Sequence, residues 1–375
     1  MTNLQSLSQQ EIDFILERGV LAPSADNLQP WKFKIFQPSA GTGIFLYLDP
    51  DRLKNFCDTA LLMPYASAGA VIENIRIASQ HLGYEINLHY FPKSEDINCV
   101  AQIAFLKSQT KGHPFEEWLK IRITNRNFYE PKHIIQESFY KSCRETVKKN
   151  SGFDLFWVKG DDKRFSELSA IIGQSDQIRF ENKRLHKELF EVMRLDKDAL
   201  NKRRDGLDIR SLDAGPGSSF LFKWIASWPR LQMMNYLGLS RIFNLYAKLQ
   251  TQSSQALGLL TAPTQNPKDY VLGGELMERI WLMAAANEIA MQPMEALPIF
   301  ILNLQQNHSE NFSPAHLNQL KTLKDKFFTL FRINDQNGLI LLFRIGYAKK
   351  LASAHSPRRP LSEFLVPTSE KSVSF

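Results

Sequence analysis

Two arginines in the segment RITNR, residues 122–126, flank a threonine and an asparagine. Two guanidinium groups on one turn can bind a phosphate group through paired hydrogen bonds. Arg358 and Arg359, in the later segment SPRR, could approach the same anion from the C-terminal side. These residues favour a phosphorylated ligand. Two simpler interpretations stay open, since RITNR could be a polar turn entering a helix and PRR a solvated segment.

A second polar segment, APSADNLQPW, spans residues 22–31. Its prolines brace a turn in which Ser24 and Asn27 hold a hydroxyl and an amide at fixed positions. Such groups suit the donor and acceptor edge of a flat heteroaromatic ring. Asn27 could instead bond its own backbone in an Asx turn. Trp31 is more typical of a core anchor than of a stacking platform.

A third segment, MQPMEA at 291–296, follows a long apolar helix pattern. We expect it to end that helix in a constrained turn whose backbone N–H groups could face a ligand. The sequence contains no H-E-x-x-H, G-x-S-x-G or phosphate-loop pattern, and its histidines show no metal spacing. We therefore predict neither a metal site nor nucleophilic catalysis.

The elements that position these segments alternate between helical and strand patterns. Ser8 and Glu11 have capping-box spacing and predict a first helix that ends at Arg18. A long helix is expected to end at Gly83, and further helices are expected at 114–121, 133–148 and in GGELMERIWLMAAANEI. Expected strands are WKFKIF, GIFLYLDP, the segment after Gly83, CVAQIAFLK, GFDLFWVK, ALGLLTAP, LPIFILNL and GLILLFRIGYA.

The two long helices resemble each other. When Gly69 is aligned with Gly274 without gaps, Glu73 meets Glu278 and apolar residues meet at neighbouring positions. Both helices lead into a strand, which favours two related halves. Two buried amphipathic helices could also share this period by chance.

Composition narrows the class of protein. The chain has 375 residues, 43% of them hydrophobic, and a net charge of +7. Acidic residues are interleaved with the basic ones, so we expect no nucleic-acid partner. We also expect no membrane partner, because no apolar run reaches about 18 residues and the N-terminus lacks a signal-peptide pattern. Cys57, Cys99 and Cys143 are isolated, which fits a reducing cytoplasm and argues against disulfides or zinc.

The motifs together resemble the nitroreductase superfamily of FMN-binding flavoproteins. APSADNLQPW is similar to its A-P-S-x-x-N-x-Q-P-W signature, and RITNR to its R-x-S/T-x-R entry. GGELMERIWLMAAANEIAMQPM resembles the family's central helix and following turn, and RIGYA with SPRRPLSEFL its C-terminal end. The resemblance implies cofactor binding by Pro23, Ser24, Asn27, Arg122, Thr124, Arg126, Gln292, Pro293, Met294, Glu295, Arg358 and Arg359.

The order of the motifs differs from that of ordinary members, which carry the arginine motif first and work as homodimers. Here APSADNLQPW comes first, as expected for a fused pseudo-dimer similar to the mycobacterial Acg proteins. We therefore expect an α+β fold with three α/β/α layers, made of related halves at 1–113 and 114–375. We expect a monomer with one working site, whose second half carries a helical insert at about 160–265. The insert could be a lid over the flavin, or a helical pair that completes the core or an oligomer face.

The resemblance implies an oxidoreductase without catalytic side chains of its own. NAD(P)H would pass a hydride to FMN, which would then reduce a small electron-poor acceptor such as a nitroaromatic or a quinone in a ping-pong cycle. The alternatives are a protein that sequesters FMN and an accessory protein in cofactor biosynthesis. The chain departs from the family pattern at Thr124, which replaces the commoner serine. It also departs at Glu288, which stands where glycine is usual, so we expect this helix end to close differently.

Overall fold

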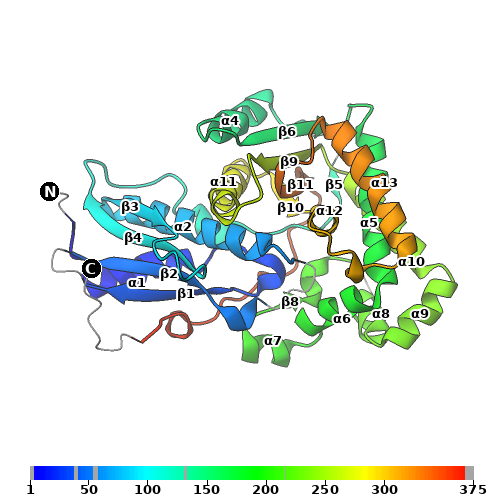
Figure 1. Ribbon diagram of the computed structural model, residues 1–375, viewed down its shortest axis with the longest axis horizontal. Helices are drawn as coiled ribbons and strands as arrows, with labels where there is room; N and C mark the ends of the chain where they lie inside the picture. Colours follow the sequence, from blue (N-terminus) through cyan, green and yellow to red (C-terminus); the bar gives the residue numbers. More distant parts are fainter. Residues whose placement is uncertain (1–3, 38–40, 54–57, 131–132, 216, 368–375) are drawn as a thin grey trace.

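The computed structural model describes residues 4–37, 41–53, 58–130, 133–215 and 217–367. Two antiparallel sheets lie on either side of a pair of long helices (Figure 1). Among the described residues, no helix is long and apolar enough to cross a membrane. Cys99 and Cys143 are buried free thiols, and Cys57 lies outside the described ranges.

The first sheet has the strand order β1-β2-β4-β3. Strands β1 and β4 alternate in part between buried and partly buried residues, and edge strand β3 alternates between exposed and partly buried ones, as expected for a sheet with one covered face. Helices α1 and α2 pack together in the core that covers this face. The elements of this half are α1 (Gln9–Gly19), β1 (Trp31–Phe36), β2 (Gly43–Leu48), α2 (Leu62–Leu82), β3 (Tyr84–Tyr90) and β4 (Cys99–Lys107).

The second sheet repeats this arrangement with the order β6-β9-β11-β10. In both halves a helix and two strands are followed by a long helix and two more strands, and the strands take equivalent places. The elements are α4 (Glu137–Lys148), β6 (Asp154–Lys159), β9 (Ala256–Ala262), α11 (Pro267–Ala286), β10 (Ala290–Pro293) and β11 (Gly338–Ala348). Before them come α3 (Trp118–Ile121) and β5 (Tyr129–Glu130), which pairs with β11.

Insertions give the second half its third layer. Helices α5, α12 and α13 share an apolar core with one face of the second sheet, while α11 packs on the other face. Between β6 and β9 lie α5 (Phe165–Glu181), α6 (Lys183–Val192), β7 (Met193–Arg194), α7 (Lys197–Arg203), β8 (Leu207–Asp208), α8 (Ser218–Ile225), α9 (Trp228–Tyr236) and α10 (Leu239–Gln252). Between β10 and β11 lie α12 (Ala296–Gln305) and α13 (Pro314–Phe331).

Two details differ from the sequence expectations. LPIFILNL was expected to be a strand but forms most of α12, because a short run that is apolar all round fits a buried helix as well as a buried strand. The segment expected as a helical insert, about 160–265, also contains β9, every residue of which is buried in the second sheet. The inserted helices end at Gln252.

Helices α2 and α11 touch backbone to backbone at the two aligned glycines. A Cβ atom built on Gly69 would lie 1.9 Å from the carbonyl oxygen of Val271. One built on Gly274 would lie 2.0 Å from the carbonyl oxygen of Ala66. The aligned residues therefore meet at one crossing, as expected where a local two-fold relation places equivalent residues together.

The C-terminal ends of these helices also correspond. Gly83 follows α2 with φ of 88°. Glu288, its aligned counterpart, has φ of 57°, in the left-handed region that favours glycine. A glutamate thus adopts the backbone region that glycine adopts in the first half, but the end also closes differently, as expected, because Asn287 with φ of −105° lies between α11 and Glu288.

The segment after β11 returns to the first half of the chain. The N–H of Phe33 in β1 donates to the carbonyl of Phe364, and the N–H of Val366 donates to the carbonyl of Phe33, both at 2.8 Å. This segment therefore covers the edge of the first sheet and carries residues 354–359 to the loop at 22–31.

Candidate functional site

The loop at 22–31 has a strained backbone. Asp26, Asn27 and Gln29 have φ values of 49°, 54° and 53°. Left-handed backbone costs roughly 1–2 kcal/mol for a residue other than glycine, and less for Asn and Asp. The hydroxyl of Ser24 accepts the N–H of Gln29 at 2.9 Å and holds the turn closed. Strain of this kind is common at ligand-binding loops.

Asn27 is fixed by the C-terminal segment and not by an Asx turn. Its Nδ2 donates to the carbonyl of Pro357 at 3.0 Å, and its Oδ1 accepts from Nη1 of Arg358 at 2.8 Å. Arg358 also donates to the carbonyls of Ser356, Val20, Leu21 and Ala22. Burial and the nearby guanidinium of Arg122 lower the pKa of Arg358 to about 9. Its donors are thus largely used to hold the loop.

The RITNR segment lies beside β10. Thr124 forms a parallel bridge with Met291, and the N–H of Asn125 donates to the carbonyl of Met291 at 3.2 Å. Nε of Arg122 donates to Oε1 of Glu278 in α11 at 2.9 Å. Burial raises the pKa of Glu278 to about 7, and its Oε2 has no hydrogen-bond partner among the described residues. Arg122 is therefore committed to a buried carboxylate.

Arg126 is less committed. Its Nη1 donates to the carbonyl of Ser211 at 3.0 Å, and no carboxylate of the described chain lies within ion-pair distance. Burial lowers the pKa of its guanidinium, whereas Asp26 and Asp213 oppose that shift. Arg126 is therefore the predicted phosphate ligand with the most unused donors.

These segments border a cavity of about 720 Å³. Ligand pockets typically span roughly 300–1,000 Å³, so the volume suits a cofactor or substrate. Of the predicted residues, it is lined by Pro23, Ser24, Thr124, Arg126, Gln292, Pro293, Met294 and Glu295. A smaller cavity of about 70 Å³ shares several of these residues and is lined in addition by Asn27, Arg122, His355 and Arg358.

The third predicted segment differs from its expected conformation. Gln292 and Pro293 lie in strand β10 and not in a turn that ends a helix, because α11 already ends at Ala286. The N–H of Met294 donates to the carbonyl of Leu342 at 2.7 Å, so it is not free for a ligand.

A buried arginine fixes the side chain of Gln292. Nε of Arg344 donates to Oε1 of Gln292 at 2.7 Å. The Arg344 guanidinium also stacks over the ring of Tyr129, with 3.9 Å from Cζ to the ring centroid. Burial lowers the pKa of Arg344. Arg344 thus acts as a positioning residue for the strand that borders the cavity.

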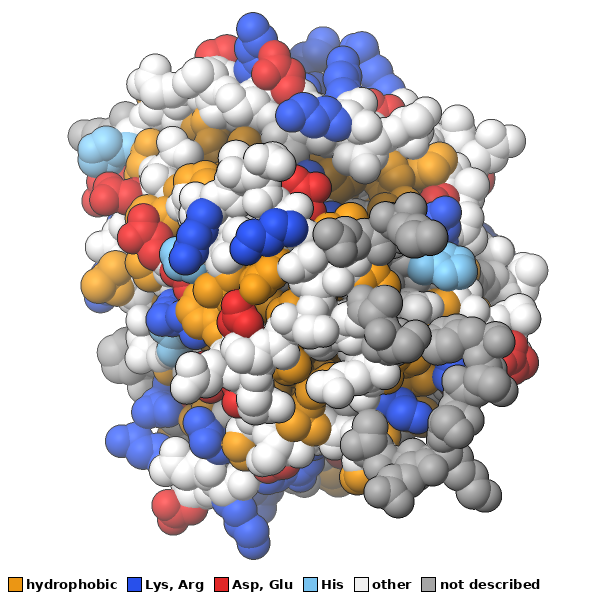
Figure 2. All heavy atoms as spheres, turned by 90° about the vertical axis from the view of Figure 1, so that its left-hand side faces the viewer, with side chains coloured by type: hydrophobic (Ala, Val, Ile, Leu, Met, Phe, Trp, Pro, Cys, Tyr) orange, Lys and Arg blue, Asp and Glu red, His pale blue; other side chains and the backbone are white. Residues whose placement is uncertain are grey.

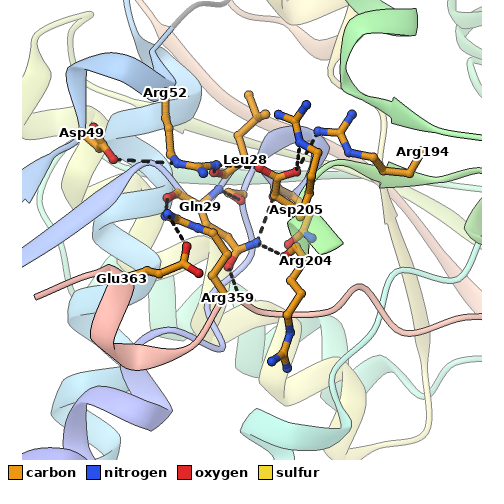
Figure 3. Close-up of polar contacts among 12 residues, drawn as sticks. Leu28, Gln29, Asp49, Arg52, Arg194, Arg204, Asp205, Arg359 and Glu363 are labelled. Carbon is orange, nitrogen blue, oxygen red and sulfur yellow. Dashed lines mark hydrogen bonds and ion pairs between the residues drawn. The ribbon is translucent and has the colours of Figure 1, made fainter. Parts of the chain in front are cut away.

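Arg359 lies outside both cavities. Its N–H donates to Oε1 of Gln29 and its Nη2 to the carbonyl of Gln29, both at 3.0 Å. Figure 3 shows this pair beside Arg52, which bonds to Asp205 of the insert at 2.9 Å. The side chain of Gln29 also donates to the carbonyl of Arg204 at 2.9 Å. Arg359 therefore joins the loop, the insert and the C-terminal segment.

The carboxyl groups of Glu295 and Asp176 line the cavity, and the sequence predicted no catalytic role for either. Oε1 of Glu295 accepts the N–H of Leu342 at 3.0 Å, and its Oε2 is buried without a partner in the described chain. Burial raises the pKa of Glu295 well above 4.5. Burial also raises the pKa of Asp176 in α5, which the nearby Arg179 opposes. Burial therefore favours the protonated form of both carboxyl groups.

Several further lining residues lacked a sequence signal. Arg179 and Asp176 stand three residues apart on a charged helix and match no motif. Trp281, one helical turn after Glu278, packs under the guanidinium of Arg122 with 4.7 Å from Cζ to the ring centroid. Its place in α11 could have been inferred from the helix period, but its contact with Arg122 depends on the fold.

No protein-family profile matches the chain. A Mycobacterium tuberculosis (strain CDC 1551 / Oshkosh) protein called "Uncharacterized protein MT1398" is 21% identical over 341 residues, which cover 91% of this chain and 46% of that protein. "Putative NAD(P)H nitroreductase acg" of the same strain is 29% identical over 173 residues, which cover 45% of this chain and 50% of that protein. The chain spans about half the length of the curated relatives it matches.

Among solved structures, one match is the FMN-dependent nitroreductase NfnB of Mycobacterium smegmatis in complex with NADPH. It is 16% identical with a TM-score of 0.38, and the match covers 68% of this chain and 97% of that one. Another is a nitroreductase of Desulfovibrio desulfuricans in complex with FMN, at 10% identity and a TM-score of 0.34, covering 70% and 100%. The similarity to the acg protein supports the resemblance to the nitroreductase superfamily that the sequence motifs indicate.

Proposed function

We propose that the chain is a flavoprotein oxidoreductase that binds FMN in the 720 Å³ cavity, with the flavin phosphate at Arg126. The observation that carries the proposal is the convergence of three separate segments, from 22–31, 122–126 and 291–296, on this one cavity. The relative called "Putative NAD(P)H nitroreductase acg" supports the same class of reaction.

The residues present fit such a cofactor. Arg126 has a half-buried guanidinium with unused donors, and Thr124 adds a hydroxyl beside it, as a phosphate needs. Ser24 and the strained loop border the same space and would address the ring edge and the ribityl chain. We assign the phosphate to Arg126. Arg122 and Arg358 would not bind it directly, because Arg122 donates to Glu278 and Arg358 donates to the loop carbonyls.

Bound FMN would take a hydride from a nicotinamide and pass the electrons to an electron-poor acceptor such as a quinone or a nitroaromatic compound. The protein's own part is to position the flavin and to exclude water from it. Arg344 holds Gln292 along the cavity wall. Because the N–H of Met294 donates to Leu342, the backbone N–H of Glu295 is the one in this segment that would face the flavin ring. The Glu295 carboxyl borders the cavity, and burial raises its pKa.

We also propose that the chain divides near residues 113 and 114 and has one such site. Glu73 is the aligned counterpart of Glu278 in the first half. It is paired with Arg279 at 2.6 and 2.8 Å, and not with an arginine from a preceding motif. The buried carboxylate is therefore neutralised from within the helix pair. The sequence before residue 114 also contains no R-x-T-x-R segment that could serve a mirror site.

The phosphate assignment is tested by comparing FMN with riboflavin, which lacks the phosphate. Arg126→Ala should weaken FMN binding roughly 30-fold, because a hydrogen bond to a charged group contributes about 2 kcal/mol, and should leave riboflavin binding nearly unchanged. Arg144→Ala, on the exposed side of α4, is the matched control and should change neither. Equal losses for both flavins, or no loss for FMN, would contradict the assignment.

A protein that sequesters FMN is the second candidate. It is favoured by the helices inserted between β6 and β9, since residues of α5, α6, α8 and α10 line the cavity and cover what it holds. Adding NADPH to the FMN-loaded protein separates the two functions. Rapid bleaching of the flavin absorbance, restored by a quinone, supports the oxidoreductase, whereas tight flavin that NADPH does not bleach supports sequestration.

A further inference from the structure

Helices α8, α9 and α10 leave large apolar side chains exposed to solvent. The exposed fractions reach 76% at Phe220, 85% at Tyr236 and 77% at Leu237. Ile242, Leu245 and Leu249 of α10 are exposed by 61%, 53% and 46%. Single exposed apolar residues are ordinary, but several on consecutive packed helices mark a contact surface.

The exposed residues of α10 share one face of the helix. Ile242, Leu245 and Leu249 are separated by three and four residues, which places them on one side. Asn244 lies on another side, where it packs against Gly173 of α5. Helix α10 is therefore amphipathic, with one side in the protein core and an apolar side in solvent.

The charge on these helices has a single sign. No aspartate or glutamate occurs between Asp213 and Asp269. Helices α8, α9 and α10 carry Lys223, Arg230, Arg241 and Lys248. The opposite end of the molecule, which faces the viewer in Figure 2, interleaves acidic and basic side chains.

We propose that α8, α9 and α10 form a docking surface for an anionic lipid bilayer. Apolar and aromatic side chains beside Lys and Arg, without acidic residues, are the composition of helices that lie in the membrane interface. Anionic headgroups neutralise the cations while the apolar side chains enter the boundary of the acyl chains. A second copy of this chain suits the surface less well, because it would bring like charges together.

This mode of binding needs no spanning segment. The sequence expectation of no membrane partner rested on the absence of a long apolar run, which excludes a transmembrane helix but not a helix lying in the interface. The docking surface also adjoins the cavity, because Ile242 is both 61% exposed and part of the cavity lining.

Co-sedimentation of the full chain with vesicles tests the proposal. We expect binding to vesicles of phosphatidylcholine with phosphatidylglycerol, weak binding to phosphatidylcholine alone, and weaker binding at high salt. Leu245→Glu should lower the partition coefficient about tenfold or more, since it replaces an inserted apolar group by an anion. Ile134→Glu is the matched control, because Ile134 is 78% exposed outside these helices.

A second pair of variants tests the charges without touching an apolar residue. Arg230→Glu/Arg241→Glu should lower binding to the anionic vesicles by at least tenfold, since each cation near such a surface contributes about 1 kcal/mol. Lys148→Glu/Lys149→Glu, on the exposed end of α4, should have little effect. Three outcomes would overturn the proposal: no binding to anionic vesicles, equal losses in test and control variants, or a dimer in solution that Leu245→Glu dissociates.

Discussion

The crossing of α2 and α11 allows a quantitative test at Gly274. In Gly274→Ala the new Cβ would meet the Ala66 backbone, at 2.0 Å from its carbonyl oxygen and 2.6 Å from its carbonyl carbon. Backbone atoms cannot rotate away as a flexible side chain can, so the two helices must separate. Separation also loosens the contact at Gly69, which packs on the same crossing.

Two opposing effects set the magnitude. Alanine is favoured over glycine by about 1 kcal/mol inside a helix. Overpacking in a filled core costs about 1–3 kcal/mol and occasionally more. Here the distance from the new Cβ to the Ala66 carbonyl oxygen is shorter than an ordinary van der Waals contact by more than about 1 Å. We therefore expect Gly274→Ala to lower the free energy of unfolding by about 2 kcal/mol and, for a chain of this length, the Tm by about 2–3 °C.

Thermal unfolding followed by circular dichroism measures this change. Gly160→Ala is the control, because its Cβ would lie 3.5 Å from the nearest backbone oxygens, which is an ordinary contact. If Gly274→Ala were as stable as the wild type or more stable, helix propensity alone would decide the outcome. The close backbone contact at the crossing would then be refuted.

Three further predictions concern helix ends and buried carboxyls. Glu288→Gly should stabilise the protein by about 0.5–1 kcal/mol, since it relieves a left-handed glutamate, whereas Glu17→Gly inside α1 should destabilise it in the same urea titrations. Asp58→Ala should cost about 1–2 kcal/mol, because Asp58 accepts the N–H groups of Leu62 and Met63 at the start of α2, and Asp58→Asn should recover part of that loss. The pKa of Glu278 is about 7 in the folded protein against 4.5 in the unfolded chain. The free energy of unfolding of the wild type should therefore fall relative to that of Glu278→Gln as the pH rises from about 4.5 to 7. Parallel profiles of the free energy of unfolding against pH would contradict this.

Much of the architecture was accessible from the sequence because it depends on local periodicity. The alternation in WKFKIF predicted a strand, CVAQIAFLK was expected to be another, and both form where expected. The capping box at Ser8 and Glu11 is present, with the Ser8 N–H donating to Glu11 at 2.8 Å. The gap-free alignment of Gly69 with Gly274 predicted related halves, and those glycines lie at one helix crossing.

What the sequence missed depends on contacts between distant residues. LPIFILNL carries no period that separates a buried helix from a buried strand. The different tasks of Arg126, Arg358 and Arg359 could not be separated either, since all are arginines in plausible motifs. Only the fold shows that Arg358 is used by loop carbonyls and Arg359 by Gln29, while Arg126 keeps free donors.

The return of the C-terminal segment to β1 has a consequence for synthesis of the chain on the ribosome. Phe33 emerges early, but its backbone partners at Phe364 and Val366 are translated more than three hundred residues later. The edge of the first sheet therefore stays uncovered while the second half is being made, although N-terminal units generally fold first. An open strand edge invites pairing with other nascent chains. We expect slow translation or delayed release to favour aggregation of this protein, and a chaperone that shields the edge of β1 to raise its yield.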